Sequence, residues 1–276
     1  WKNDMSAVYN LARMWYFTGN TNYAQRGHDI LIAWANTMTN FGGVEAGLDL
    51  GDMAMAYGGG ADILRGTWPG WTAADTLAVS NLFVNVYLPR TGSTNLWVLG
   101  PANKGALQMA ASVACAVFND DTNLFNQLLY VYRSDAAAGV HNNCLTSGEM
   151  GETGRDQGHA FNDLLKMAWT AEVFYKQGID VYSEDDNRLL ACGEYYARNN
   201  LPAANTAFIP FGTVDAYYWY NSAGARGDTT EPTMGDILRS AYVVRKGLTA
   251  PWMVLRRYAA PPHYGVGGSQ TENENS

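Results

Sequence analysis

The chain has 276 residues, of which 47% are hydrophobic and 16% are charged, and its formal net charge at pH 7 is −8. This length is enough for one large domain or two small ones, and for a substantial hydrophobic core. The acidic balance argues against a nucleic-acid-binding protein, which needs a clustered excess of Lys and Arg. It remains compatible with an anionic ligand, because a few cations focused in one cleft can hold a polyanion.

Several further classes of protein are excluded by missing patterns. The sequence has no run of about 18 uncharged apolar residues, so no membrane partner is expected. Its start lacks the order of a signal peptide, which indicates a mature, trimmed or partial chain. Phosphate-binding, dinucleotide-binding, nucleophile-elbow and zinc-protease motifs are absent, and we expect neither a cofactor nor a metal. The three cysteines, Cys115, Cys144 and Cys192, lack zinc spacing. They are either three buried thiols or one disulfide and one thiol.

Helical periodicity dominates the chain from its first residues. Apolar residues recur at spacings of three and four and stop at Gly, Asn or Pro, which is typical of amphipathic helices. Strand signals occur only in residues 207–220, where Gly, Pro and aromatic residues interrupt the helical pattern. The sequence predicts helices over residues 5–19, 22–40, 50–66, 73–89, 104–120, 122–135, 157–178, 186–199 and 234–247.

The pattern predicts an all-α fold, specifically an α/α toroid built from helical hairpins. Residues 106–118 contain no charge, so this helix is expected to be covered on more than one side, as in an inner ring of helices. No repeat of fixed period appears, which disfavours a regular solenoid. We expect one domain over residues 1–265. The Pro-, Gly- and polar-rich end predicts a flexible tail over residues 266–276.

A dense polar cluster, EMGETGRDQGH at residues 149–159, precedes an apolar helix. Thr153 is predicted to cap this helix, with Asp156 three residues later as the partner of a capping box. Arg155 and His159 would then lie on one helical face at the positive end of the helix dipole, where an anion binds favourably. In the alternative interpretation, Arg155 pairs with Glu149 or Glu152 and His159 merely packs.

Two other groups of residues are candidates for a ligand site. Asn103 and Lys104 precede the uncharged helix, where a buried helix would open into a cleft; the alternative is that Asn103 simply caps that helix. Aromatic residues cluster in the later loop and could stack on sugar rings, and a Tyr hydroxyl could transfer protons. Alternatively, they cover the core. The aromatic residues are Tyr217, Tyr218, Trp219 and Tyr220.

Ordered motifs over roughly residues 5–265 resemble the alginate lyase-like polysaccharide lyases, the α/α-toroid group that includes alginate and polyglucuronate lyases. The motifs are SGEMGETGRDQGH, AEVFYKQGIDVYSEDDNRLLACGEYYARNNL, VVRKGLTAPW and AVFNDDTNLF. The resemblance implies β-elimination on a uronate-containing polysaccharide, an anionic partner. It also implies a secreted or periplasmic location, because such polymers are extracellular.

The resemblance also implies roles for residues. Asn103 would neutralise the substrate carboxylate, Arg155 would be a nearby cation, and His159 would be the base or its partner. A tyrosine would transfer a proton; we favour Tyr218, with Tyr217 and Tyr220 as alternates. Tyr242 stands where the family tends to have a His, and His263 matches a late family His. The expected substrate-binding residues are Lys104, Gln157, Tyr217, Trp219, Tyr220, Tyr242 and His263.

Two other functions fit the same residues. An α/α-barrel glycoside hydrolase would use two of Glu149, Glu152 and Asp156 as acid and base. A non-catalytic protein would bind oligouronates without turnover.

Overall fold

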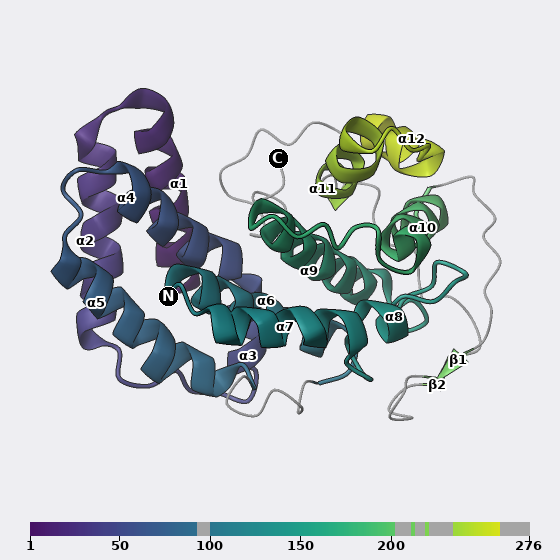
Figure 1. The fold of residues 1–276 in the computed structure, drawn as a ribbon, viewed down its shortest axis with the longest axis horizontal. Coiled ribbons are helices and arrows are strands. Elements are labelled where there is room, and N and C mark those ends of the chain that lie inside the picture. The colour runs from purple at the N-terminus through teal and green to yellow at the C-terminus, as the bar shows by residue number, and fades with distance from the viewer. Residues whose placement is uncertain (93–99, 202–210, 213–218, 221–233, 260–276) are drawn as a thin grey trace. The chain divides into compact units, whose positions relative to one another are not determined.

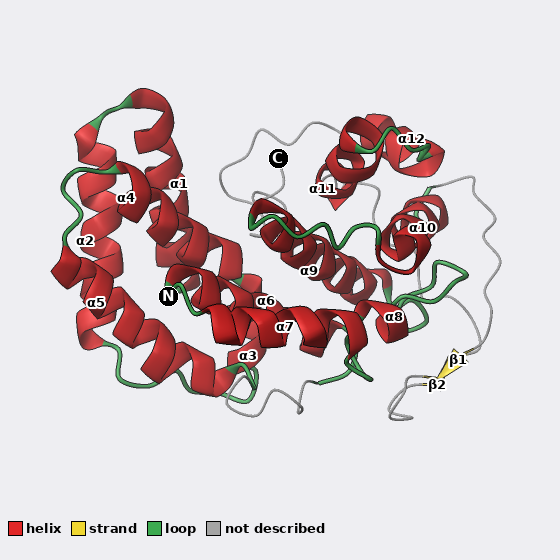
Figure 2. Cartoon of the chain, viewed as in Figure 1, coloured by secondary structure: helices red, strands yellow, loops and turns green. Residues whose placement is uncertain are grey.

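The computed structural model describes residues 1–92, 100–201, 211–212, 219–220 and 234–259. Within these ranges helices joined by loops make up the chain, together with two short strands, as Figure 2 shows, so the predicted all-α class is confirmed. None of the described helices has the length and apolar character needed to cross a membrane. The chain divides into two compact units: the first comprises Trp1–Val98 and Leu107–Leu128, and the second Leu99–Ala106 and Leu129–Ser276. The single domain expected over residues 1–265 stays a prediction.

The first unit is built from short helices with clear start and stop signals. Asn20 accepts a hydrogen bond from the backbone of Asn22, and Thr72 and Asp75 form a complete capping box. Gly19 ends the first helix in a left-handed conformation, which costs glycine little. The elements are α1 (Lys2–Thr18), α2 (Thr21–Thr37), α3 (Ala46–Asp52), η1 (Met55–Gly59), α4 (Gly60–Thr67), α5 (Ala73–Leu82), η2 (Phe83–Tyr87) and η3 (Leu88–Arg90).

Close helix packing in the first unit depends on glycine. α1 packs on α2 and α4 (Figure 1). A Cβ on Gly60 would lie 2.9 Å from Val8 and 3.2 Å from the Tyr9 backbone, so α1 and α4 approach more closely than a side chain allows. A Cβ on Gly51 would lie 2.3 Å from the Leu107 carbonyl oxygen. The backbones of α3 and α6 therefore also approach more closely than a side chain at this position would allow.

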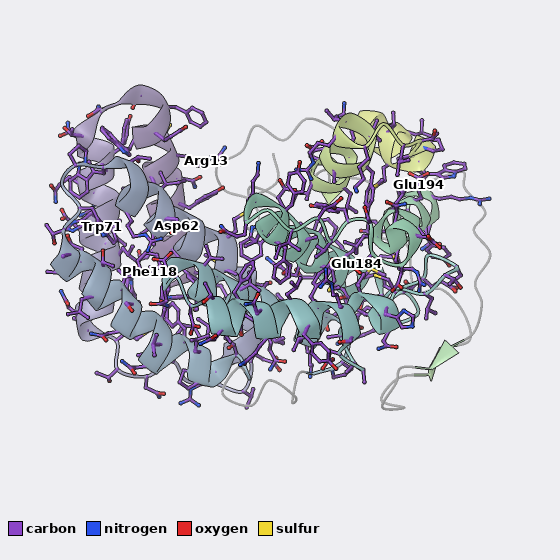
Figure 3. All side chains as sticks on the ribbon, viewed as in Figure 1. Arg13, Asp62, Trp71, Phe118, Glu184 and Glu194 are labelled. Carbon is purple, nitrogen blue, oxygen red and sulfur yellow. The ribbon has the colours of Figure 1, made fainter. Side chains whose placement is uncertain are left out.

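The other end of the first unit is held by polar and aromatic contacts around Phe118. The Arg65 guanidinium lies 4.6 Å from the Phe118 ring centroid, and its Nη2 donates to Asp62 at 3.1 Å. Trp71 makes an edge contact with the same ring. Figure 3 labels Asp62, Trp71 and Phe118 in this region. These contacts join α4 and the Trp71 turn to the C-terminal end of α6.

The remaining elements belong wholly or partly to the second unit, and α9 is central to their packing. Twelve of its 20 residues are buried, so it is covered on more than one face. It packs against α10 and α11, while α12 packs on α10 and α11. The elements are α6 (Asn103–Phe118), α7 (Thr122–Ser134), α8 (Val140–Asn143), α9 (Gln157–Lys176), α10 (Glu184–Asn199), β1 (Phe211–Gly212), β2 (Trp219–Tyr220), α11 (Met234–Arg239), η5 (Ser240–Arg245) and α12 (Pro251–Ala259).

The predicted helices are largely confirmed, with differences at their interruptions. Residues 50–66, 73–89 and 234–247 do not form single α-helices, because a π-helical segment interrupts each of them; a 3₁₀ segment also follows the π-helical one in residues 73–89. The helices α8 and α12 were not predicted. Residues 207–220, where strand signals were expected, contain the antiparallel pair β1 and β2. The absence of charge in residues 106–118 is explained by burial, since nearly every residue of this stretch is buried.

The short helix α12 was not predicted, because long-range contacts define its start and its apolar pattern is too short to detect. Pro251 occupies its first position, where the missing N–H costs nothing. The Glu194 carboxylate on α10 accepts hydrogen bonds from the backbone N–H groups of Trp252, at 3.1 Å, and Met253, at 2.9 Å. Glu194 is labelled in Figure 3. The cap therefore comes from a residue far away in the sequence.

Candidate functional site

The site begins at the N-terminal end of α6. Ala102 has a φ of 48°, a left-handed conformation that is costly for a residue with a side chain and is frequent at functional sites. Asn103 follows as the first residue of the helix and is 4% exposed. Its Oδ1 has no hydrogen-bond partner among the described residues. The alternative in which Asn103 serves as an ordinary helix cap is therefore not supported, because the helix begins at Asn103 itself.

A second segment, residues 143–156, packs against this helix start. The Asn143 Oδ1 accepts from the Gly151 N–H at 3.2 Å. A Cβ on Gly151 would lie 2.6 Å from the Ala102 Cβ and 2.7 Å from the Asn143 Oδ1. Only glycine allows the two segments to come so close. The segment that carries the polar cluster is thereby fixed next to Asn103.

The start of α9 differs from the prediction. Thr153 is not its cap: the helix begins at Gln157, and Asp156 is the N-cap in extended conformation. The Asp156 Oδ1 accepts from the His159 N–H at 2.9 Å. The Thr153 hydroxyl instead accepts from the Met150 N–H at 2.8 Å, which holds the preceding turn. Consequently Arg155 lies before the helix, and the predicted helical face shared with His159 does not exist.

Asp156 nevertheless joins the two predicted residues. Its Oδ2 lies 2.6 Å from the His159 Nδ1 and 3.8 Å from the Arg155 Nε. Although partial burial opposes ionisation, hydrogen bonds from the His159 backbone and ring hold the pKa of the Asp156 carboxyl below its usual range. A carboxylate on Nδ1 favours the tautomer with its proton there, which leaves Nε2 as the basic nitrogen. The His159 side chain is 39% exposed, so the ring is partly open to solvent.

Glu152 connects these residues with Asn103. Its side chain is fully buried, and its closest cation is the Arg155 Nη1 at 3.5 Å, as the alternative interpretation expected. Burial raises the pKa of the Glu152 carboxyl, while Arg155, His159 and the Asn103 backbone N–H oppose that increase. Arg155, His159 and the Asn103 backbone N–H therefore all act on Glu152. The predicted residues Asn103, Arg155 and His159 lie near this carboxyl in the second unit.

A buried carboxyl that was not predicted, Asp163, holds Asn143, the residue that binds the Gly151 backbone next to the site. Asp163 is 0% exposed, and its Oδ1 accepts from the Asn143 Nδ2 at 2.7 Å. Burial raises the pKa of Asp163 well above its usual value; the Asn143 hydrogen bond lowers it and the nearby Glu152 raises it further. Asp163 lies four residues after His159 on α9. Asp163 stands within the mainly apolar part of α9, but Lys166 follows three residues later, so the charge alone did not single it out. Nothing in the sequence distinguished Asn143.

Glu149 is buried and contacts residues of its own turn and of α10. Its carboxylate is 0% exposed, accepts from the Ser147 hydroxyl at 2.5 Å, and lies 3.4 Å from the Tyr195 hydroxyl. Burial and the Glu149 charge both raise the pKa of Tyr195. Glu149 therefore holds its own turn against α10 and is closed to solvent.

Some expected substrate-binding residues have other surroundings. Gln157 is 2% exposed; its Nε2 donates to the Thr153 carbonyl at 3.0 Å and its Oε1 accepts from Asn200 at 2.9 Å. Tyr242 is fully buried, and its hydroxyl donates to the Tyr182 carbonyl at 2.9 Å. Both side chains are committed to the core and do not face a ligand.

The remaining expected residues are adjacent to the site or lie outside the description. Lys104 follows Asn103 on α6 and is partly exposed. Trp219 and Tyr220 form β2, and their side chains are not described. Tyr217, Tyr218 and His263 lie outside the described residues. The expected tyrosine of the site consequently stays a prediction.

The chain matches a family of known proteins. The sequence profile of the family described as alginate lyase, whose fold is a helical toroid, matches residues 1–202. This span contains Asn103, Arg155, Asp156 and His159. It is shorter than the resemblance expected over residues 5–265. No curated protein matches the chain. Because the profile covers most of its 276 residues, the chain belongs to the alginate lyase family.

Proposed function

We propose that the protein is a polysaccharide lyase that cleaves a uronate-containing polymer by β-elimination. The observation that carries the proposal is the Asp156–His159 pair, whose carboxylate and imidazole lie 2.6 Å apart beside Arg155 and the buried amide of Asn103. This arrangement combines a base with groups that recognise an anion. Both are needed to remove a proton next to a carboxylate.

Asn103 and Arg155 are suited to binding the substrate carboxylate. The hydrogen at C5 of a uronate is only weakly acidic, because the neighbouring carboxylate is already negative. An amide donor and a guanidinium would offset that charge and stabilise the enolate that develops when the proton leaves. Glu152 keeps Arg155 in place through its ion pair at 3.5 Å. The fixed donors therefore need little reorganisation during the reaction.

His159 would remove the C5 proton through Nε2. Asp156 orients the ring and stabilises the imidazolium once the proton has been transferred. The electron pair of the C5–H bond then forms the C4–C5 double bond, the C4–O bond breaks, and the departing oxygen takes a proton. We assign that protonation to a tyrosine, with Tyr218 favoured and Tyr217 and Tyr220 as alternates. Because the substrate is a polymer found outside cells, we also place the reaction in a secreted or periplasmic setting.

The hydrolase alternative fits the carboxylates less well. Glu149 and Glu152 are both 0% exposed, so neither reaches a sugar or an attacking water. Asp156 is engaged with His159 through both oxygens. A paired-carboxylate mechanism needs one acid and one base open to the substrate.

A polysaccharide panel tests the proposal. Purified protein is incubated with alginate blocks, glucuronan, pectate and glycosaminoglycans, and the ultraviolet absorbance of the unsaturated product is followed alongside reducing ends. We expect absorbance and reducing ends to rise together on at least one uronate polymer. His159→Ala and Asn103→Ala should each lower the rate by about 10²-fold or more. Circular dichroism checks that both variants fold.

Three results would contradict the proposal. Reducing ends without absorbance would identify a hydrolase. Binding of oligouronates without any product would identify a binding protein, and its affinity would survive His159→Ala. Normal elimination by both folded variants would refute the assignment of the site.

A further inference from the structure

The second unit contains two cysteines whose side chains are neighbours. All three cysteines of the chain are buried. The structure shows Cys144 and Cys192 as free thiols, and the electrostatic interaction between them indicates that the two side chains are neighbours. Cys115 lies in the first unit, where its thiol contacts the Tyr57 hydroxyl. Cys144 and Cys192 therefore form the candidate pair. Cys115, which is also buried, serves as the control position.

The two paired cysteines lie on segments that are already fixed against each other. Cys144 forms an antiparallel bridge with Met150, and the Leu145 N–H donates to the Glu149 carbonyl at 2.8 Å. The Cys192 Sγ lies 4.0 Å from that same Glu149 carbonyl oxygen. The turn that follows Cys144 therefore folds over the Cys192 side chain.

Backbone contacts to α10 hold this turn closely. The Arg188 Nη1 donates to the Cys144 carbonyl at 2.7 Å. Gly148 has a φ of 90°, and a Cβ there would lie 2.6 Å from the Ala191 carbonyl oxygen. Disulfides form between cysteines whose Cβ atoms are close and whose backbones need not move. The contacts of Arg188, Ala191 and Glu149 hold the segments of Cys144 and Cys192 side by side.

We propose that Cys144 and Cys192 are joined by a disulfide when the chain folds in an oxidising environment. The oxidant is a small-molecule or protein disulfide. One cysteine thiolate attacks it and forms a mixed disulfide with release of one thiol, and the second cysteine then displaces the other thiol. The protein loses two protons and two electrons, and the oxidant becomes two thiols.

We expect Cys144 and Cys192 to be oxidised while the chain folds and not after folding is complete. The hydrogen bond with Cys192, followed by burial, raises the pKa of Cys144 well above its usual value. The thiolate is the reactive form, and a buried neutral thiol is inert. Oxidation therefore precedes burial, and the finished disulfide is protected from external reductants by the same burial.

The cross-link would join the turn before the candidate site to α10. The segment from Cys144 to Met150 leads directly into Glu152, Arg155 and Asp156. The disulfide would close the loop that runs from Cys144 to Cys192. Such a cross-link stabilises a protein mainly by restricting the unfolded chain. We expect the oxidised protein to melt about 5–10 °C above the reduced protein.

Peptide mapping tests the proposal without requiring activity. Denatured, reduced protein is refolded with a mixture of reduced and oxidised glutathione, or with dithiothreitol alone. Each sample is then unfolded, its thiols are alkylated, and the digest is analysed by mass spectrometry without reduction. After oxidative refolding we expect one linked peptide that contains Cys144 and Cys192, with Cys115 alkylated. Cys115→Ser should form the same link and retain the oxidation-dependent melting shift, while Cys144→Ser should lose both.

The opposite outcomes overturn the proposal. These are three alkylated cysteines after oxidative refolding, or a link that involves Cys115. The wild-type comparison stands alone if Cys144→Ser fails to fold.

Discussion

Asp156 combines two tasks in one side chain. Its Oδ1 caps α9 by accepting from the His159 N–H, and its Oδ2 faces the His159 Nδ1. The same residue thus ends the loop, starts the helix and orients the ring. A helix cap that also positions a base makes the geometry of the site depend on local backbone structure.

Asp156→Asn separates these two tasks. Asn caps helices as well as Asp does, so the stability of the fold should hold. If the amide oxygen of Asn caps the helix, the amide NH₂ faces the His159 Nδ1 and cannot accept a hydrogen bond from it. The ring therefore loses its orientation and its preferred tautomer. We expect kcat for elimination to fall about 10²-fold with little change in KM. Asp156→Ala, the control, should also destabilise the protein by about 1 kcal/mol. A kcat for Asp156→Asn within twofold of wild type would refute this positioning role.

Asp163 makes the stability of the second unit depend on pH. Burial raises the pKa of its carboxyl, so the folded state holds a proton that the unfolded state releases. The stabilising contribution is therefore complete below the ordinary Asp pKa and is lost as pH rises through the raised value.

Asp163→Asn should remove this dependence. The amide oxygen can still accept from Asn143, and no charge remains to be buried. We expect similar stability of both proteins at pH 4 and a variant more stable by about 1–3 kcal/mol at pH 8. Urea unfolding at the two pH values measures this. A parallel decline in both proteins would show that Asp163 is not the responsible group.

At the scale of elements, α9 is joined to η5 by an ion pair with favourable geometry. Arg245 donates two hydrogen bonds to Glu172, at 2.8 and 2.6 Å, and lies 4.0 Å from the Tyr175 ring centroid. The Tyr182 hydroxyl also donates to Glu172 at 2.8 Å. Burial opposes ionisation, but these donors hold the pKa of Glu172 below its usual value. The stability they provide is present above the ordinary Glu pKa and is lost at lower pH.

Arg245→Lys tests this clamp. Lysine keeps the charge but loses the two parallel hydrogen bonds and the planar contact with the ring. We expect the melting temperature to fall by about 3–8 °C at pH 7 and the difference to shrink at pH 4. Lys176→Gln is the matched control, because Lys176 also pairs with Glu172 but has a 68% exposed side chain. An equal loss in both variants would show that only charge matters.

At the scale of the whole molecule, one helix belongs to both compact units. α6 begins with Asn103 in the second unit and continues from Leu107 in the first. Unfolding either unit would remove part of this helix. The start of the helix also carries a residue of the candidate site.

Two glycine substitutions test whether the units unfold together. Gly51→Ala would place a Cβ 2.3 Å from the Leu107 carbonyl oxygen in the first unit, and Gly148→Ala would crowd the Ala191 carbonyl in the second. Each should cost about 1–3 kcal/mol. We expect a single calorimetric transition in both variants, shifted to lower temperature. Two separated transitions in either variant would contradict cooperative unfolding.

The helical class and the region of the candidate site were predictable from sequence patterns. Apolar residues at spacings of three and four reflect the helix period, so helical structure was predictable over nine stretches, although π-helical segments interrupt three of them. The charge-free stretch up to Phe118 correctly predicted a buried helix. The polar residues from Glu149 to His159 stood out because few other charges surround them. Asn103, Arg155 and His159 were identified from these local patterns alone.

Tertiary structure decided how these residues are connected. Helix starts depend on backbone dihedral angles and long-range partners, so the cap at Asp156 replaced Thr153 and moved Arg155 out of the helix. Burial likewise depends on contacts between distant segments. It assigned Tyr242 and Gln157 to the core and brought Asp163 beneath the site. Periodicity describes one element at a time, whereas the site exists only where residues 102–103 and 143–159 pack together.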